Sequence, residues 1–294
     1  MRPADATTDP LSRSLTDAVA GKRKPLFDLL ARGSRLPGTR MNEDLAEAFA
    51  QACRTRGAPA DPVALALARL GADEAPGGLA LEFLPVCGVY ALGARAAADP
   101  SVRAELVAEL HARADDLRFR VRDAVVEALG RVGGVAGDDL VRDVGSWMDG
   151  YFHAAAVVRA LGLETWLSSI HDAPGVVARL DEAFLLVKNA PRAAARWPGH
   201  KGLVDALAAS PSAIAARLGV PVLDMLARWA ATQDPALREV VATAIRSKRL
   251  AGRLGPEVQR VEAALQASKA APRNPDHDHG PSRDRSKNRK RGRR

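Results

Sequence analysis

The chain has 294 residues, 47% of them hydrophobic but only 4% aromatic, so it can bury a substantial core built mainly of small or straight apolar side chains. This composition favours helix-on-helix packing over strands, which are rich in aromatic and β-branched residues. The net charge is +8, yet residues 268–294 hold ten Lys and Arg and three Asp, so residues 1–267 carry only +1. Overall charge is therefore excluded as a reason to class the body as a nucleic-acid binder.

Residues 1–22 are predicted to be a flexible segment. Three aspartates interrupt this stretch, which lacks the continuous apolar core that a signal peptide needs. The longest weakly charged stretch of the chain, residues 83–93, is about half the roughly 20 residues that a membrane-spanning helix requires. We therefore expect a soluble cytoplasmic protein without membrane contact.

The first elements of the body are predicted to be helices over residues 25–32, 42–54 and 61–70, separated by Gly- and Pro-rich loops. A further helix is predicted to start at Asp99-Pro100, since Pro is tolerated in a first helical turn. Cys53 and Cys87 are the two cysteines. They lack CxxC spacing and nearby His, so we expect small core residues rather than metal or redox groups.

The clearest repeating unit follows this helix. Asp115 and Asp116 are suited to cap a helix start, and Val121, Val125 and Leu129 then follow helical spacing on one face. The run ends in Ala-Leu-Gly. Two more runs with the same ending give a set at Gly93, Gly130 and Gly162, offset by 37 and then 32 residues. This offset is the size of a helix pair, so the sequence predicts that such pairs repeat.

Later elements are less regular. Residues 163–174 are predicted to be irregular, 175–189 helical, and 190–202 broken by two prolines. Helices are predicted over residues 221–231, 234–245 and 256–266. From residue 268 onward Pro, Asp, His, Ser, Lys and Arg replace apolar residues, so we expect a body over 23–267 and a disordered basic tail over 268–294.

Residues 116–130, Asp-Leu-Arg-Phe-Arg-Val-Arg-Asp-Ala-Val-Val-Glu-Ala-Leu-Gly, resemble the second helix of a HEAT repeat, including the phycobilisome-lyase type. The resemblance covers residues 99–133 and, less closely, 221–250, with related runs at 82–97 and 150–162. It implies an all-α fold, an α-solenoid of HEAT-like antiparallel helix pairs, whose members mostly act as binding scaffolds. It also makes a structural ladder the expected role of Arg122 and Arg238, which occupy equivalent places in two units.

The chain carries none of the motifs that identify common enzymes: GxSxG, HExxH, a Walker-type phosphate loop or a dinucleotide-binding glycine fingerprint. Each histidine of the body, His111, His153, His171 and His200, stands alone in the sequence. We expect surface or capping roles for them. Residues 276–279, Asp-His-Asp-His, could bind a metal weakly, but without fixed geometry. The sequence thus predicts no catalytic residue, no metal site and no cofactor.

One family of HEAT-like enzymes, the alkylpurine DNA glycosylases, presents Trp and Asp side chains to a damaged base. The nearest such pair here is Trp147 and Asp149. Two residues apart on one α-helix, their side chains point about 200° apart and are not expected to converge. No catalytic residue can be carried over.

Between residues 183 and 204 there is no acidic residue, and this stretch holds four basic ones. The candidate partner- or phosphate-binding residues are Lys188, Arg192, Arg196 and Lys201. Arg192 and Arg196 would share a face if Pro191 began a helix. The alternative is a solvated loop with ordinary surface charges. A second basic group, at residues 246–253, is expected only to complement the dipole of a helix end.

The tail is the second candidate binding element. Its polyanion-binding residues are predicted to be Lys287, Arg289, Lys290, Arg291, Arg293 and Arg294, which could attract nucleic acid or acidic proteins without sequence preference. No aromatic residue lies among them for base stacking. The alternative is a solubilising tail.

Together these features predict a non-enzymatic HEAT-repeat scaffold that binds an as yet unidentified protein partner, with a basic tail that adds weak affinity for polyanions. The alternative is a nucleic-acid-binding HEAT-like protein, related to the alkylpurine DNA glycosylases. A structure in which Lys188, Arg192, Arg196, Arg246 and Arg249 lie together on one concave surface beside a Trp would favour this nucleic-acid-binding alternative.

Overall fold

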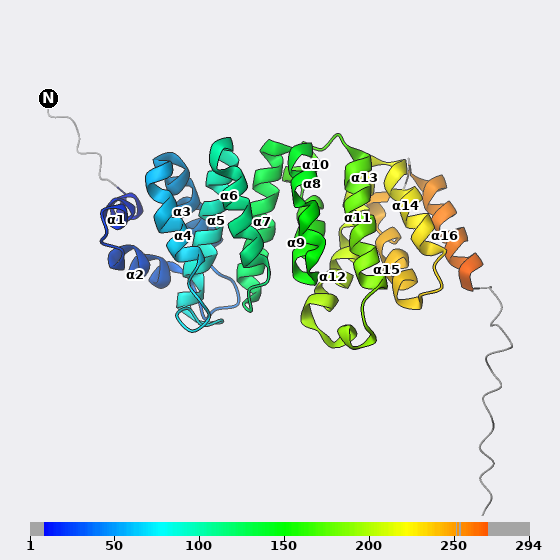
Figure 1. Ribbon diagram of the computed structural model, residues 1–294, viewed down its shortest axis with the longest axis horizontal. Coiled ribbons are helices and arrows are strands. Elements are labelled where there is room, and N and C mark those ends of the chain that lie inside the picture. Colours follow the sequence, from blue (N-terminus) through cyan, green and yellow to red (C-terminus); the bar gives the residue numbers. More distant parts are fainter. Residues whose placement is uncertain (1–8, 251, 253, 270–294) are drawn as a thin grey trace, which may run out of the picture.

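The computed structural model describes residues 9–250, 252 and 254–269, and every regular element within these ranges is a helix. The predicted all-α class is therefore confirmed. The helices stand side by side along the long axis of the molecule, in chain order from α1 to α16 (Figure 1). Apart from Ser268 and Lys269, which belong to the last helix, the predicted tail lies outside the described residues.

Most helices belong to one of two rows. The first row consists of α3 (Glu43–Arg56), α5 (Phe83–Ala98), α7 (Phe119–Ala136), α9 (Tyr151–Leu161), α12 (Pro198–Ala209) and α15 (Pro235–Ile245), each in contact with the next. The second row stands against it and consists of α4 (Asp61–Ala68), α6 (Pro100–Ala114), α8 (Asp138–Asp143), η3 (Val144–Asp149), α11 (Ala173–Lys188), α14 (Val220–Ala230) and α16 (Gly255–Lys269).

Shorter elements fill the ends and joints. Helices α1 (Pro10–Val19) and α2 (Lys24–Gly33) cover the end formed by α3 and α5, while the remainder are η1 (Ala58–Ala60), η2 (Ala80–Glu82), α10 (Glu164–Leu167), η4 (Arg192–Arg196), α13 (Pro211–Leu218) and η5 (Lys248–Leu250). The predicted flexible segment over 1–22 is wrong for α1. Leu11, Leu15 and Ala18 fall on one face of this helix and are buried, which holds it to the body.

Helix α5 is the centre of the first half of the molecule. It contacts α3, α4, α6 and α7, and almost all of its side chains are buried. Within the described ranges, Ala80–Ala98 is the one helical stretch long and apolar enough to cross a membrane, with a mean hydropathy of 1.2. Because 83% of its apolar window is buried inside the protein, it has the environment of a core helix.

The glycines of the Ala-Leu-Gly runs mark the points where neighbouring elements approach closely. A Cβ at Gly93 would lie 2.6 Å from Cβ of Ala128 in α7, and one at Gly130 would lie 2.6 Å from a methyl group of Leu163. The same feature joins α5 to α4, because a Cβ at Gly88 would lie 2.2 Å from the backbone nitrogen of Ala68. Two of the Ala-Leu-Gly runs thus lie where α5 contacts α7 and where α7 contacts Leu163.

Aspartate caps begin several helices where the sequence predicts a start. The Asp99 side chain accepts a hydrogen bond from the Ser101 backbone N–H, and the Asp234 side chain accepts from that of Ala236. The start of α7 differs from prediction, because the helix begins at Phe119 rather than after Asp116. Instead of capping α7, the Asp116 carboxylate accepts from the backbone and guanidinium of Arg118.

Arg118 holds the loop before η2 against the start of α7. Its guanidinium is 5% exposed and donates to the carbonyl oxygens of Leu70, Gly71 and Ala75 at 2.7 to 3.3 Å. Beside it, Arg120 donates to the buried carboxylate of Glu82 at 2.9 Å. The Arg118 guanidinium thereby supplies donors to loop carbonyl groups, among them that of the buried Ala75.

Candidate interaction face

Two adjoining grooves run across the exposed side of the first row. The first has a volume of about 430 Å³ and lies between the start of α3, α5, α7 and α9, and the second, about 330 Å³, lies between α7, α9 and α12. Both are lined by Asp123 and Arg159, so they form one continuous surface. We call this surface, lined by residues of α7, α9 and α12 and their neighbours, the row-one face.

The first groove mixes acidic, basic and aromatic side chains. Burial, followed by the nearby charge of Glu43, raises the pKa of Glu127. The ring of Phe119 is 54% exposed and lies 4.6 Å beneath the guanidinium of Arg120. Tyr90 lines the floor from α5, and burial raises its pKa further above the physiological range. The groove thus offers an aromatic side chain and charges of both signs.

The second groove is built around a cation–π pair. The guanidinium of Arg122 lies 4.2 Å over the ring of Phe152, and burial lowers its pKa. Arg159 pairs with Asp123 at 2.7 Å on the wall shared with the first groove. Lys201 lines the opposite wall from α12 and is exposed. Arg122 also donates to the backbone carbonyl of Asp116, a bond within its own unit rather than between repeats.

Aromatic side chains continue the row-one face beyond the second groove. The ring of Tyr151 lies 6.1 Å from that of Trp197 and 5.3 Å from that of His200, measured between ring centroids. Trp197 is 47% exposed. Large exposed rings of this kind are enriched at protein interfaces, where they bury much area at a small entropic cost.

Exposed apolar residues also gather on the segments that Arg118 and Arg120 hold together. Leu79 and Leu81 belong to the loop and η2, while Leu117 precedes α7 and is 87% exposed. Phe119, at the first residue of α7, connects this group to the first groove. Grouped exposed leucines point to an interaction surface, whereas scattered ones need no explanation.

The four predicted basic residues are distributed over three elements, α11, η4 and α12. Lys201 lines the second groove, whereas Lys188 ends α11 with its amino group 5.9 Å over the ring of Trp229. Arg192 and Arg196 are exposed and belong to η4. This is a 3₁₀ helix with three residues per turn, so side chains four positions apart point about 120° apart rather than sharing a face.

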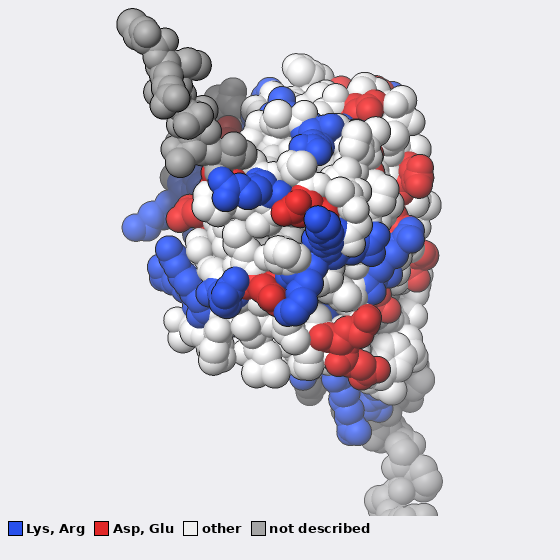
Figure 2. Space-filling model, turned by 90° about the vertical axis from the view of Figure 1, so that its left-hand side faces the viewer, with Lys and Arg blue, Asp and Glu red and all other residues white. Residues whose placement is uncertain are grey.

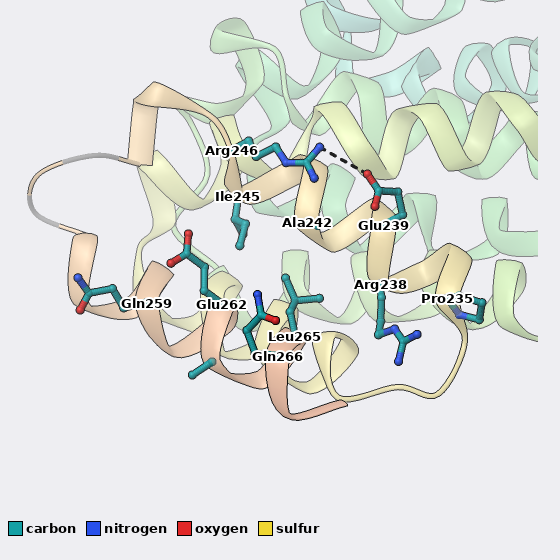
Figure 3. A pocket seen from close by; sticks show the side chains of 11 residues that line it. Pro235, Arg238, Glu239, Ala242, Ile245, Arg246, Gln259, Glu262, Leu265 and Gln266 are labelled. Carbon is teal, nitrogen blue, oxygen red and sulfur yellow. Dashed lines mark hydrogen bonds and ion pairs between the residues drawn. The ribbon is translucent and has the colours of Figure 1, made fainter. Parts of the chain in front are cut away.

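Arg246, of the second basic group, and Arg238, of the expected ladder, both have partners within the protein. Arg246 pairs with Glu239 at 3.4 Å, and Arg238 donates to the backbone carbonyl of Ser268, again a structural contact. Figure 3 shows these residues around a groove of about 790 Å³ between α15 and α16, which the buried Ile245 also lines. Glu262 faces the groove from α16. The groove combines both charges with apolar side chains and brings no reactive groups together.

Two predictions about other residues have clear outcomes. Cys53 and Cys87 are fully buried, as expected for core residues, and burial raises the pKa of the Cys53 thiol to about 12. The prediction that Trp147 and Asp149 do not converge is wrong, because both line one groove of about 450 Å³. They belong to η3, a 3₁₀ helix with non-helical angles at Met148, rather than to an α-helix. Trp147 is only 3% exposed.

The prediction that the histidines stand alone is wrong for His111 and His153. Both rings contact the carboxylate of Asp149, His111 at 3.1 Å and His153 at 2.8 Å. Asp149 and His153 are four residues apart, and His111 precedes Asp149 by 38 residues, close to the repeat offset. That spacing was the signal available in the sequence. The tail candidates, from Lys287 to Arg294, and the Asp-His-Asp-His segment lie outside the described residues.

Comparison of the chain with protein-family models gave no match, and comparison with curated proteins found no similar sequence.

Proposed function

We propose that the protein is a HEAT-like α-solenoid scaffold that binds a protein partner through the row-one face, without catalysis of its own. Two rows of helices in chain order, whose contacts run mainly between neighbours, support the solenoid part of the proposal. The Ala-Leu-Gly runs at those contacts support it further, because each repeat would pack against the next through the same motif.

The row-one face supports a protein as the partner. It presents half-exposed Phe119 and Trp197 beside the Arg159–Asp123 ion pair, so apolar area and both charges lie together. Nucleic acid selects surfaces dominated by positive charge. At the N-terminal end too, Asp and Glu side chains lie between groups of Lys and Arg (Figure 2). The partner would place an apolar side chain against these rings. Carboxylates of the partner would lie near Arg122 and Lys201.

One observation supports the alternative that the protein binds nucleic acid: residues 268–294 are basic in composition. We assign that part of the chain a weak attraction to polyanions that acts independently of the row-one face. The near-neutral body and the separation of Lys188, Arg192 and Arg246 count against nucleic-acid binding by the helices themselves. We place the protein in the cytoplasm, where such a scaffold would meet its partner.

The test compares two double variants of the full chain, used as baits in an extract of source cells. Replacing Phe119 and Trp197 by Ala removes two exposed rings of the row-one face. Replacing Val135 and Leu185 by Ala removes comparably exposed apolar side chains elsewhere. Quantitative mass spectrometry should show proteins retained by the wild type and the control but lost from the face variant. Equal capture by all three would exclude the row-one face as the binding surface.

A further inference from the structure

A compact cluster of nitrogen and oxygen ligands joins the two rows, where the end of α6 and η3 meet the start of α9. His111, Asp149 and His153 each offer one atom, and these atoms all lie within 4.8 Å of one another. The two imidazole rings are stacked, with centroids 3.9 Å apart and planes at 28°. The edge of His111 also meets Trp147, with centroids 5.0 Å apart. Within the part of the chain that the structure describes, it is the one group of three or more such residues that could hold a metal ion.

The distances fit a metal ion after small side-chain rotations. Nδ1 of His153 lies 2.8 Å from Oδ1 of Asp149, and Nε2 of His111 lies 3.1 Å from Oδ2. Bonds of about 2.0 to 2.2 Å in tetrahedral geometry separate neighbouring ligand atoms by about 3.3 Å. The observed hydrogen-bond distances need to open only slightly for an ion to enter between the three groups.

The backbone holds this cluster in place. His111 lies in the last turn of α6, Asp149 ends η3, and Gly150 then takes an extended conformation before α9. This extended residue and the first turn of α9 bring His153 back against Asp149. A Cβ at residue 150 would lie 2.8 Å from Nδ1 of His153, so the absence of a side chain at Gly150 leaves room for the ring. Three separate elements therefore supply the three ligands.

The protonation chemistry is compatible with a bound cation. Burial raises the pKa of Asp149, but hydrogen bonds with His111 and His153 outweigh that effect and lower it overall, so the carboxylate is ionised. Without a metal ion, the ring nitrogens that face Asp149 can donate to this carboxylate. On metal binding a neutral imidazole moves its proton to the other ring nitrogen, and the freed lone pair becomes the ligand.

We propose that His111, Asp149 and His153 bind a first-row divalent transition-metal ion, zinc being the probe of choice. Two imidazoles and one carboxylate form a ligand set that binds such ions in preference to magnesium or calcium. Three protein ligands leave a coordination position open, and Asp149 is 51% exposed beside a groove of about 450 Å³. Water or a ligand from a partner completes the coordination there. The ion ties the end of α6 to the start of α9.

The test uses the full chain with His277 and His279 replaced by Ala, so that the Asp-His-Asp-His segment cannot supply imidazole ligands. Zinc affinity and stoichiometry are measured by competition with a chromophoric chelator. We expect one zinc ion per chain, and a loss of affinity of at least about tenfold in His111→Ala and in His153→Ala. The cobalt(II) complex should show visible absorption bands that both variants change.

His171→Ala is the control, since it also removes one imidazole but His171 is exposed and lies outside the cluster. It should leave zinc affinity unchanged. Circular dichroism of each variant checks that the helices remain folded. The proposal is overturned if the parent protein binds no zinc at millimolar concentrations, or if both cluster variants bind it as tightly as the parent.

Gly150→Ala gives a second test that removes no ligand. The added methyl group would push the His153 ring away from Asp149. Zinc affinity should therefore fall although all three ligands are present. Zinc should also raise the thermal unfolding midpoint of the parent more than that of this variant, because a ligand stabilises the folded state according to its affinity. Equal zinc affinity and equal stabilisation in both proteins would contradict the proposed geometry.

Discussion

Among single residues, Arg118 is a buried charge that makes hydrogen bonds to several groups at once. It connects Asp116 with three carbonyl groups of a loop almost fifty positions earlier in the chain. Burial raises the pKa of Asp116, but its bonds to Arg118 lower it overall, so the carboxylate keeps its charge beside the guanidinium. The arginine thus replaces the backbone partners that this loop lacks.

Replacing Arg118 by Leu should lower the free energy of unfolding by about 3 kcal/mol, because it leaves the partly buried Asp116 carboxylate without its ion-pair partner and removes the guanidinium donors to the carbonyl groups of Leu70 and Ala75. Urea unfolding followed by circular dichroism measures this change. Arg142→Ala is the control, since its ion pair with Asp139 is more than 60% exposed on both sides and should contribute less than about 1 kcal/mol. Similar losses in the two variants would contradict the structural role of Arg118.

The residues of the sites were harder to predict than those of the core. Cys53, Cys87 and the Val121 stripe follow from composition and periodicity alone, because burial depends on a local pattern. Trp147 and Asp149 converge only because η3 is a 3₁₀ helix with a kink, which no periodicity in the sequence indicates. Phe119 and Trp197 carry no local signal of exposure. They become a surface only when separate helices are placed side by side.

At the scale of elements, the close packing of helices depends on glycines, which have no side chain. Helix α5 approaches the backbone of α4 at Gly88 and the backbone of α7 at Gly93. In Gly88→Ala the new methyl group would meet the backbone nitrogen of Ala68, which cannot rotate away as a side chain could. The two helices must then separate, at a cost of about 1–3 kcal/mol.

Thermal and urea unfolding of Gly88→Ala test this packing argument. Gly255→Ala is the matched control, because no atom lies within 4 Å of the added carbon at the start of α16. It should be neutral or slightly stabilising, as Ala is the better helix former. If Gly88→Ala proved as stable as this control, α4 and α5 could not be packed as closely as described.

Helix starts were predictable where sequence carries a cap. Asp99, Asp172 and Asp234 precede Pro or a Pro-containing turn, and all three side chains accept backbone hydrogen bonds at helix starts. Helices α1, α12 and α13 are among those missed, and the prediction that prolines break residues 190–202 is wrong for Pro198, which begins α12. All three helices begin at a proline, which in isolation fits a loop or a first helical turn equally well, and α13 is only eight residues long. Tertiary packing decides between these readings.

At the scale of the whole molecule, charge divides the chain into a nearly neutral body and a basic C-terminal part. We expect full-length protein to bind single-stranded RNA with an affinity that falls linearly with salt on logarithmic axes. Replacing the six basic residues Lys287, Arg289, Lys290, Arg291, Arg293 and Arg294 by Ser should abolish this binding. Fluorescence anisotropy at several salt concentrations measures both proteins.

The control for the tail variant replaces Lys188, Arg192, Arg196 and Lys201 by Ser, the basic residues of the body stretch. Because these four side chains belong to three different elements and the body is nearly neutral, the control should bind RNA nearly as well as the wild type. The reverse result, with binding lost from the body variant and kept in the tail variant, would favour the nucleic-acid alternative.

The unequal burial of the tryptophans gives the molecule its own optical reporters. Trp166 is fully buried and donates its indole N–H to the carbonyl of Gly137, whereas Trp197 stands half exposed on the row-one face. An aqueous quencher such as acrylamide therefore reaches one chromophore and not the other. Short-wavelength emission then follows the integrity of the core, while long-wavelength emission follows occupation of the face, in a single unlabelled sample.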